Sequence, residues 1–496
     1  MREKVSLTDI LIEKKSIQNV SVPTYNRKDV TVGIVHIGLG GFHRSHQAYY
    51  VDSLLASCTP KNWGICAVSL LQSDFHIYDV LTNQEGLYTL ITPDQDSKYT
   101  ARIIGSIVER IYAPENPDSL IQKLANEDLK IITLTITEGG YNISSDGGFN
   151  WSNQDVVWDL SHLDNPKTVF GYLCTGLKLR KSKGLKGVTI QSCDNIEHNG
   201  DVIRRMLYSF VEKVDLDLVK WMDENVTFPN SMVDRITPVT SDELKNEVTN
   251  LFQLEDGWPI IAESFCQWII EDNYANGRPD WERVGVHLVK DVTPYEKMKI
   301  RLLNGGHTLV GLAGYLCGHK YIHESVEDAD ILKLWRKYMD VEVTPTLDIV
   351  DKIDTDEYKN SLIERFRNPF LNDTVERIIS NSSAKFPSFI LPVIKERSDA
   401  NLNIRIGSLI VAFWYVYLQL NLDKVDVIND VLTTQLVDYT NRAEQENNPL
   451  LFLELPHVFD EISGSKEFHE NFLCHINALK KYDAKLYIQS LLQEQQ

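Results

Sequence analysis

The chain has 496 residues, which is more than a single hydrophobic core usually holds, so two domains are expected. Lys and Arg total 50 against 70 Asp and Glu, and the net charge of −20 disfavours nucleic acid and anionic membranes as partners. Seven scattered cysteines without a CxxC pair argue against a disulfide framework and indicate a reducing, cytoplasmic compartment. The charged N-terminus does not resemble a secretory signal, and the longest apolar run, residues 408–420, predicts a buried helix rather than a membrane span.

The first elements along the chain predict the opening of a βαβ unit. Residues 1–30 are polar and interrupted by Pro23, which predicts an extended arm. Residues 30–37 are rich in Val and Ile and predict a strand, and a glycine turn follows. Residues 43–55 then predict a helix.

Three more apolar runs predict strands that end in polar or glycine-rich turns, at residues 62–70, 130–136 and 187–191. Helical stretches between such runs are typical of a buried parallel sheet, which binds ligands at the carboxyl ends of its strands. After about residue 290, long helical patterns dominate. We therefore expect an α/β protein with a Rossmann-type dinucleotide-binding domain over residues 1–290 and a mainly helical substrate domain over residues 291–496.

The glycine turn Gly38-Leu39-Gly40-Gly41-Phe42-His43 is similar to GxGxxG, with a histidine at the third glycine position. Such a turn lets a pyrophosphate approach the backbone at a helix N-terminus, although an ordinary strand-to-helix turn has the same pattern. Asp74, after the second strand, could accept from the ribose hydroxyls, which favours NAD; the neighbouring polar residues leave NADP open. His43 and His46 have no third ligand at a recognisable spacing, so no metal is expected.

The strongest chemical pattern opens the helical domain. At about 100° per residue, a helix places Glu296, Lys299, Asn304 and His307 within an arc of about 140°. A desolvated lysine is held in its neutral form and can accept a hydroxyl proton, and an amide can donate to the developing alkoxide. The alternative is a solvated polar face, but Gly305 and Gly306 cost helix stability and indicate close approach of a backbone or a ligand.

Two further segments contribute polar groups. Asn195 follows the strand predicted at 187–191, where it could donate to the same alkoxide or form an ordinary turn. Asp234 and Arg235 lie in a predicted loop between two prolines, where a local ion pair is the alternative interpretation.

Five segments together carry a resemblance. GLGGFHRSH, TEGGYN, SCDNIEHNG, FPNSMVDRITP and EKMKIRLLNGGH are similar, in the same order, to the motifs of the polyol-specific long-chain dehydrogenase/reductase family. The resemblance spans residues 30–420. It implies Lys299 as the general base, Asn195 and Asn304 as oxyanion-hole amides, His307 beside the lysine and Glu296 on a proton path. It also implies substrate contacts from Asp234, Arg377 and Lys385, in a site between the two domains, and cofactor contacts from Gly38, Gly40, Gly41, Phe42, His43, Arg44, Asp74 and Glu138.

The resemblance implies hydride transfer between NAD(P) and C2 of a sugar alcohol, without a metal, and D-mannitol oxidation to D-fructose is the preferred reaction. Reduction of fructuronate and oxidation of D-arabinitol are alternatives within the family, because Arg377 or Lys385 could hold a carboxylate and Ser380 replaces a histidine of some relatives. A non-catalytic nucleotide-binding protein is disfavoured because the whole set of catalytic residue types is present. Many proteins of the family that the sequence resembles are monomers, so oligomerisation is not assumed, and an oligomer stays open.

Overall fold

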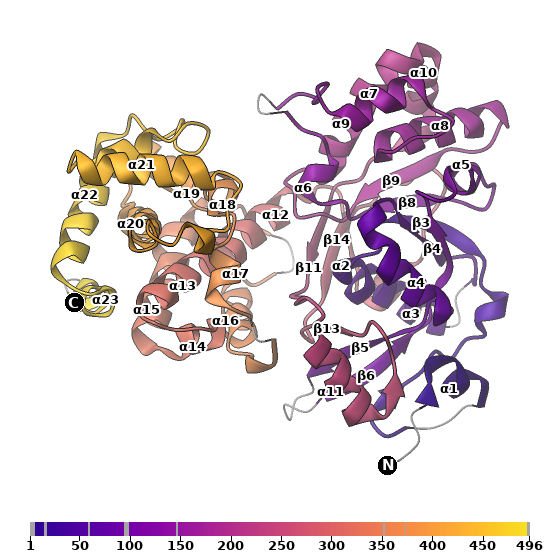
Figure 1. The fold of residues 1–496 in the computed structure, drawn as a ribbon, viewed down its shortest axis with the longest axis horizontal. Helices are drawn as coiled ribbons and strands as arrows, with labels where there is room; N and C mark the ends of the chain where they lie inside the picture. The colour runs from indigo at the N-terminus through magenta and orange to yellow at the C-terminus, as the bar shows by residue number, and fades with distance from the viewer. Residues whose placement is uncertain are drawn as a thin grey trace. The chain divides into compact units, whose positions relative to one another are not determined.

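The computed structural model describes residues 5–13, 17–57, 60–93, 99–144, 147–350, 353–371 and 373–493. The chain divides into two compact units, Met1–Thr293 and Pro294–Gln496, and each is considered by itself. The first unit combines strands and helices, whereas the regular elements described in the second are helices (Figure 1).

A six-stranded parallel sheet forms the centre of the first unit, with the strand order β10-β9-β8-β3-β4-β7. Its strands are β3 (Val32–Ile37), β4 (Gly64–Ser69), β7 (Ile107–Tyr112), β8 (Ile131–Leu134), β9 (Val188–Ser192) and β10 (Val226–Thr227). In chain order this is the 3-2-1-4-5-6 arrangement of dinucleotide-binding folds, in which the strand order reverses between β3 and β8. The predicted α/β class is confirmed.

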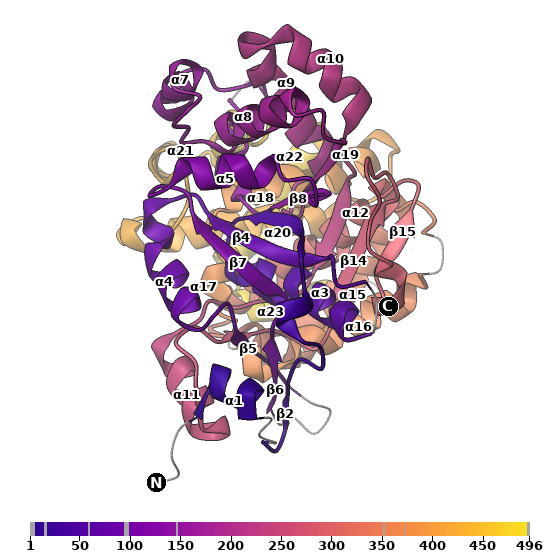
Figure 2. The same ribbon diagram turned by 90° about the vertical axis from the view of Figure 1, so that its right-hand side faces the viewer.

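Alternating side chains of the central strands enter two different cores. Val35 and Ile37 belong to a core shared with helices α5, α8, α9 and α10, while Ile34 belongs to a core shared with α3. The first four helices lie on one face of the sheet and α3 lies on the other (Figures 1 and 2). The helices of this unit are α1 (Leu7–Glu13), α2 (Gly41–Ser45), α3 (Gln47–Ala56), α4 (Phe75–Asn83), α5 (Pro117–Leu124), α6 (Thr137–Gly140), α7 (Gln154–Ser161), α8 (Val169–Ser182), α9 (Asn199–Val214), α10 (Leu216–Asn225) and α11 (Asp242–Phe252).

Three smaller sheets complete the first unit. Their orders are β13-β5-β6-β2, β11-β14-β15 and β1-β12. Their strands are β1 (Val5–Ser6), β2 (Val20–Ser21), β5 (Tyr88–Pro93), β6 (Tyr99–Ile104), β11 (Ser231–Asp234), β12 (Leu254–Glu255), β13 (Ile260–Ile261), β14 (Gln267–Glu271) and β15 (His287–Val289).

Two local predictions in this unit were wrong. The segment predicted as an extended arm contains helix α1 and strands that pair with β12 and β6, because Leu7 and Ile10 are apolar enough to enter a core. The helix predicted at 43–55 is broken at His46, whose φ of −111° and ψ of −86° separate α2 from α3.

The second unit is a helical domain. Its helices are α12 (Thr293–Lys299), α13 (Gly305–Leu316), α14 (Ile322–Glu327), α15 (Ala329–Lys337), α16 (Thr355–Phe366), α17 (Val375–Ile379), α18 (Ser382–Phe389), α19 (Leu391–Asp399), α20 (Arg405–Leu420), α21 (Thr433–Gln445), α22 (Lys466–Lys481) and α23 (Ala484–Gln493). Helix α20 contains the long apolar run and is buried along most of its length, as predicted. Among the described residues, no helix is both long and apolar enough to cross a membrane.

Candidate functional site

The glycine turn lies at the carboxyl end of β3, where the strand order reverses. Gly38 has a φ of +113°, and a Cβ on it would lie 2.0 Å from the carbonyl oxygen of Thr135, so only glycine fits there. Gly40 differs, because a Cβ on it would find only the Gly38 oxygen, 3.9 Å away. The chain's own packing does not require glycine at position 40, so the bare backbone fits the approach of another group such as a pyrophosphate.

A stacked pair of buried histidines supports this turn. The rings of His36 and His43 are parallel, with centroids 3.4 Å apart. Nε2 of His36 donates to the Gly38 carbonyl at 2.8 Å, and Nδ1 lies 2.8 Å from the Thr133 hydroxyl, which itself donates to Oε1 of Gln47 at 2.9 Å. Burial lowers the pKa of His36 to about 3, and burial followed by the charge of His36 lowers the pKa of His43 well below its usual value. Both rings are therefore neutral where they pack beneath the turn.

The neighbouring side chains of the motif are also internal. The Arg44 guanidinium is buried and donates to the Trp258 carbonyl at 2.6 Å, and it lies over the Tyr88 ring. The Phe42 ring stacks on His46. The side chains of His43 and Arg44 are thus packed inside the protein, and the Gly40 N–H donates to the Gly38 carbonyl at 2.7 Å. The cofactor contacts expected of these residues stay predictions.

An aspartate that sequence reasoning missed joins two more turns at this edge of the sheet. The Asp194 carboxylate accepts from the backbone N–H groups of Ile136 and Thr137 at 3.0 and 3.1 Å, and from the Tyr141 hydroxyl at 2.7 Å. Burial raises its pKa. The turn after β8, which presents the exposed Glu138, is thereby tied to the turn after β9, which presents the exposed Asn195. The SCDN sequence contained this residue, but only the strand neighbourhood shows what its carboxylate binds.

Asp74 and Asp234 occupy different environments. The half-buried Asp74 carboxylate accepts from the Leu71 N–H at 3.2 Å and begins α4, so it also shapes the turn after β4. Asp234 is buried at the end of β11, opposite Gln267 of β14. The next residue, Arg235, donates to the Glu263 carbonyl at 3.0 and 2.8 Å. The structure therefore places Asp234 on a strand rather than in the predicted loop.

The stretch from Glu296 to His307 is not the uniform α-helix that the sequence predicted. Helix α12 ends at Lys299, a π-helical segment spans Ile300–Asn304, and α13 begins at Gly305. A π-helix rotates less per residue, which brings Asn304 and His307 back toward the direction of Lys299. The face that carries the four groups is therefore narrower than predicted. Glu296 and Lys299 are buried, and Asn304 and His307 are half-buried.

His307 lies in a field of positive charge. Burial lowers its pKa well below the usual value, and the charges of Arg377, Arg365, Lys385 and Lys299 lower it further. Arg365 was not singled out from the sequence, since no motif marks it. Burial and these basic neighbours keep the ring neutral, and the guanidinium groups of Arg377 and Arg365 make this part of the helical unit attractive to hydroxyl oxygens and anions.

The two predicted substrate cations are anchored in the same unit. The guanidinium of Arg377 in α17 forms a bidentate pair with the Asp373 carboxylate, with N···O distances of 2.5 and 2.6 Å. Lys385 of α18 donates to the Ile378 carbonyl at 2.7 Å. Ser380 donates to the Arg377 carbonyl at 2.7 Å, while Asn372 lies outside the described residues. Asp373 is a second positioning group that sequence reasoning missed.

Gly305 and Gly306 have explanations inside the protein. A Cβ on Gly305 would lie 3.3 Å from the Phe389 carbonyl oxygen, and a Cβ on Gly306 only 2.3 Å from Nε1 of Trp335. The close approach predicted from these glycines is therefore made by the helical unit's own groups.

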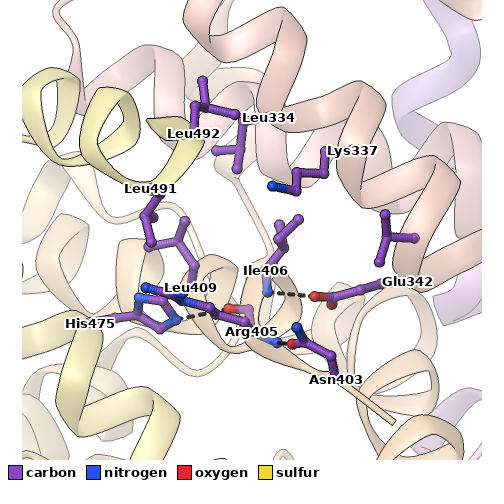
Figure 3. Close-up of a pocket in the computed structure, with 11 residues that line it drawn as sticks. Leu334, Lys337, Glu342, Asn403, Arg405, Ile406, Leu409, His475, Leu491 and Leu492 are labelled. Atoms are coloured by element: carbon purple, nitrogen blue, oxygen red, sulfur yellow. Dashed lines mark hydrogen bonds between the residues drawn. The ribbon is translucent and has the colours of Figure 1, made fainter. Parts of the chain in front are cut away.

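Other features of the described residues lie apart from these groups. A small hollow of the helical unit, shown in Figure 3, is lined by Glu342, Arg405, His475 and several leucines, none of them a predicted site residue. Glu342 accepts there from the N–H groups of Ile406 and Gly407, at 2.6 and 2.8 Å. Across the described ranges, no three His, Cys, Asp or Glu side chains are grouped to hold a metal. The six described cysteines are free, and Cys58 lies outside the described residues.

Fold and site together define a class of protein: a Rossmann-type unit with an open glycine turn, followed by a helical unit with a buried lysine, an amide and a neutral histidine. The models of the mannitol dehydrogenase Rossmann domain and the mannitol dehydrogenase C-terminal domain match residues 32–283 and 291–480. The chain belongs to the mannitol dehydrogenase family, which confirms the resemblance seen in the sequence.

Individual proteins of known name are similar to this chain over most of its length. The mannitol 2-dehydrogenase of Phaeosphaeria nodorum is 39% identical over 95% of this chain and 83% of its own length. Mannitol dehydrogenase 2 of Saccharomyces cerevisiae is 41% identical over 90% of each chain. The solved structure of Pseudomonas fluorescens mannitol 2-dehydrogenase, a ternary complex with NAD and D-mannitol, is 37% identical, covers 99% of each chain and has a TM-score of 0.88.

Proposed function

We propose that this chain is an NAD-dependent mannitol 2-dehydrogenase that oxidises D-mannitol to D-fructose and catalyses the reverse reduction. The observation that carries the proposal is the set of Lys299, Asn304 and His307 on one narrow helical path, in a chain that is 37% identical to an enzyme solved with NAD and D-mannitol. The open Gly40 backbone fits NAD, which accepts the hydride when bound.

The residues of the chain supply the proton chemistry and the orientation. Lys299, buried in the helical unit, takes the proton of the C2 hydroxyl, and Glu296 on the same helix passes it toward solvent. The amides of Asn304 and Asn195 donate to the oxygen as negative charge develops. His307, held neutral, bonds the same oxygen or its neighbour and keeps it in line with Lys299. Asp234, Arg377 and Lys385 bind the remaining hydroxyls.

A substrate panel tests the proposal. Purified protein is assayed with D-mannitol, D-arabinitol and D-mannonate, each with NAD+ and with NADP+. The highest kcat/KM is expected for D-mannitol with NAD+. D-Mannonate belongs in the panel because the cations around His307 also suit a carboxylate. A clear preference for D-mannonate would replace our proposal with a fructuronate reductase, and a preference for NADP+ would overturn the cofactor assignment.

We also propose that the protein acts in the cytoplasm as a monomer. The six described cysteines are free thiols, which suits a reducing compartment. Fractionation of cells and sedimentation of the purified protein test these two points; a secreted pool or a stable dimer would contradict them.

A further inference from the structure

Three aromatic rings from three helices form a continuous stack in the helical unit. The His307 ring of α13 lies on the Phe366 ring of α16, with centroids 3.7 Å apart and planes at 16°. Phe366 lies in turn on Trp335 of α15, with centroids 4.8 Å apart and planes at 16°. Phe366 and Trp335 are both buried, so close packing holds these two rings in place.

Helix α13 also contacts the stack through its backbone. Gly306, which precedes the histidine, lies so close to Trp335 that a Cβ would come within 2.3 Å of Nε1. The backbone that carries His307 and the indole at the end of the stack are thus in direct contact. This leaves the imidazole little freedom to tilt or to rotate about its own bond, because either motion would lift it from Phe366.

The electrostatic setting explains why such a support matters. The basic side chains of Arg377, Arg365, Lys385 and Lys299 act on His307, and a protonated ring would be repelled by each of them that carries a charge. An imidazole left loose among these cations would turn toward water, where it could be protonated. A parallel phenyl ring covers one face of the imidazole and excludes water there, without supplying a competing hydrogen-bond partner.

We propose that Phe366, supported by Trp335, is a positioning residue that fixes the plane of the His307 ring so that a ring nitrogen meets the oxygen being oxidised. The inference rests on the proposed function, since it takes the oxygen that His307 binds to be the C2 hydroxyl of a polyol. Phe366 touches neither substrate nor cofactor in this role and acts through the histidine.

The test combines Phe366→Leu, which keeps apolar volume but removes the ring, with the conservative Phe366→Tyr. Phe472→Leu is the control for the loss of a buried phenyl ring elsewhere in the unit, in α22. We expect Phe366→Leu to lower kcat about tenfold to a hundredfold, since small displacements of a positioned group have effects of this order. The KM for NAD+ should stay unchanged in Phe366→Leu. Phe366→Tyr should retain most of the wild-type kcat, and Phe472→Leu should leave kcat unchanged.

Two further readouts separate positioning from a general structural role. In a His307→Ala background, Phe366→Leu should have no additional effect on kcat; an equal additional loss would overturn the proposal. Without substrate, NMR titration of the His307 ring should show a midpoint that rises toward 6.5 in Phe366→Leu, because the ring gains water. An unchanged midpoint would also overturn the proposal. This second readout remains valid even if the protein oxidises no mannitol, so the two proposals fail separately.

Discussion

Each unit of the molecule contains a histidine ring in a parallel stack, and the two stacks differ in their surroundings. In the Rossmann-type unit, His36 stacks on His43 and is hydrogen-bonded to the Gly38 carbonyl and the Thr133 hydroxyl. In the helical unit, His307 stacks on Phe366 among four basic side chains. Burial lowers the pKa of each of these histidines.

The difference teaches what each histidine does. One ring nitrogen of His36 donates to the Gly38 carbonyl of the glycine turn, so that stack supports the shape of the turn. The neighbours of His307 are charges rather than backbone, so this second stack determines the protonation state and direction of a reactive ring. Changes in the first unit should therefore appear as losses of stability and nucleotide binding, and changes in the second as losses of turnover.

The largest expected effect is on turnover and lies in the helical unit. Lys299→Ala should lower kcat by about 10³-fold or more, because it removes the proposed base from its buried position. NADH binding, followed by fluorescence, should stay within about twofold of the wild type. The control is Lys297→Ala on the same helix, whose ammonium instead faces Asp348 at 3.3 Å and should be dispensable. Full activity of Lys299→Ala would show that another group is the base.

Asn304→Ala should have the next largest effect. Loss of one amide that donates to a developing alkoxide costs about 10²- to 10³-fold in kcat in comparable sites. Stopped-flow measurement of a single turnover would show whether the hydride step itself is slowed. If only the KM for mannitol rose, Asn304 would bind the ground state and the π-helical segment would have no special role in the reaction.

The sequence predicted the elements whose signal is local. Buried parallel strands have continuous runs of Val and Ile, so β3, β4, β8 and β9 were found within about two residues of their observed ends. Charged and amide side chains recur at helical spacing from Glu296 to His307, and the segment is helical, but with a π-helical turn over Ile300–Asn304. The roles of its four groups stay predictions. The two-unit division had a comparable origin in the change of pattern near residue 290, and its position as a domain boundary stays a prediction.

What the sequence did not show depends on distant partners. Asp194 is one polar residue among several in its motif, and its role depends on N–H groups almost 60 positions away. Arg365 and Phe366 end an ordinary amphipathic helix, and only the packing of α16 brings them to His307. The π-helical segment was missed because a single widened turn leaves no residue pattern that differs from an α-helix. The site roles taken from the family resemblance, including that of Asn195, stay predictions.

In the Rossmann-type unit, Gly38→Ala should mainly reduce stability. The substitution strains a φ of +113° and places a methyl group against the Thr135 carbonyl, which together cost about 3 kcal/mol or more. Calorimetry should show a fall in Tm on the order of 10 °C for this unit, with weakened NADH binding. Gly139→Ala is the matched control for Tm, because a Cβ there would meet nothing within 4 Å. Equal Tm values for the two variants would mean that the turn is not held as described.

The smallest expected effect is a pH dependence that separates the two stacks. The pKa of His36 is lowered from 6.5 to about 3, so the unfolded chain binds its proton in a range where the folded chain does not. This histidine's contribution to stability is therefore complete above about pH 6.5 and is lost progressively as the pH falls toward 3. Between pH 7 and pH 5, the Tm of the wild type should fall by a few degrees more than that of His36→Gln, which has no proton to bind. His457→Gln, at an exposed position, is the control and should follow the wild type. If His36→Gln and the wild type lost stability in parallel, the imidazole of His36 would not be held neutral beneath the glycine turn. The structural role that we assign to the first stack would then be wrong.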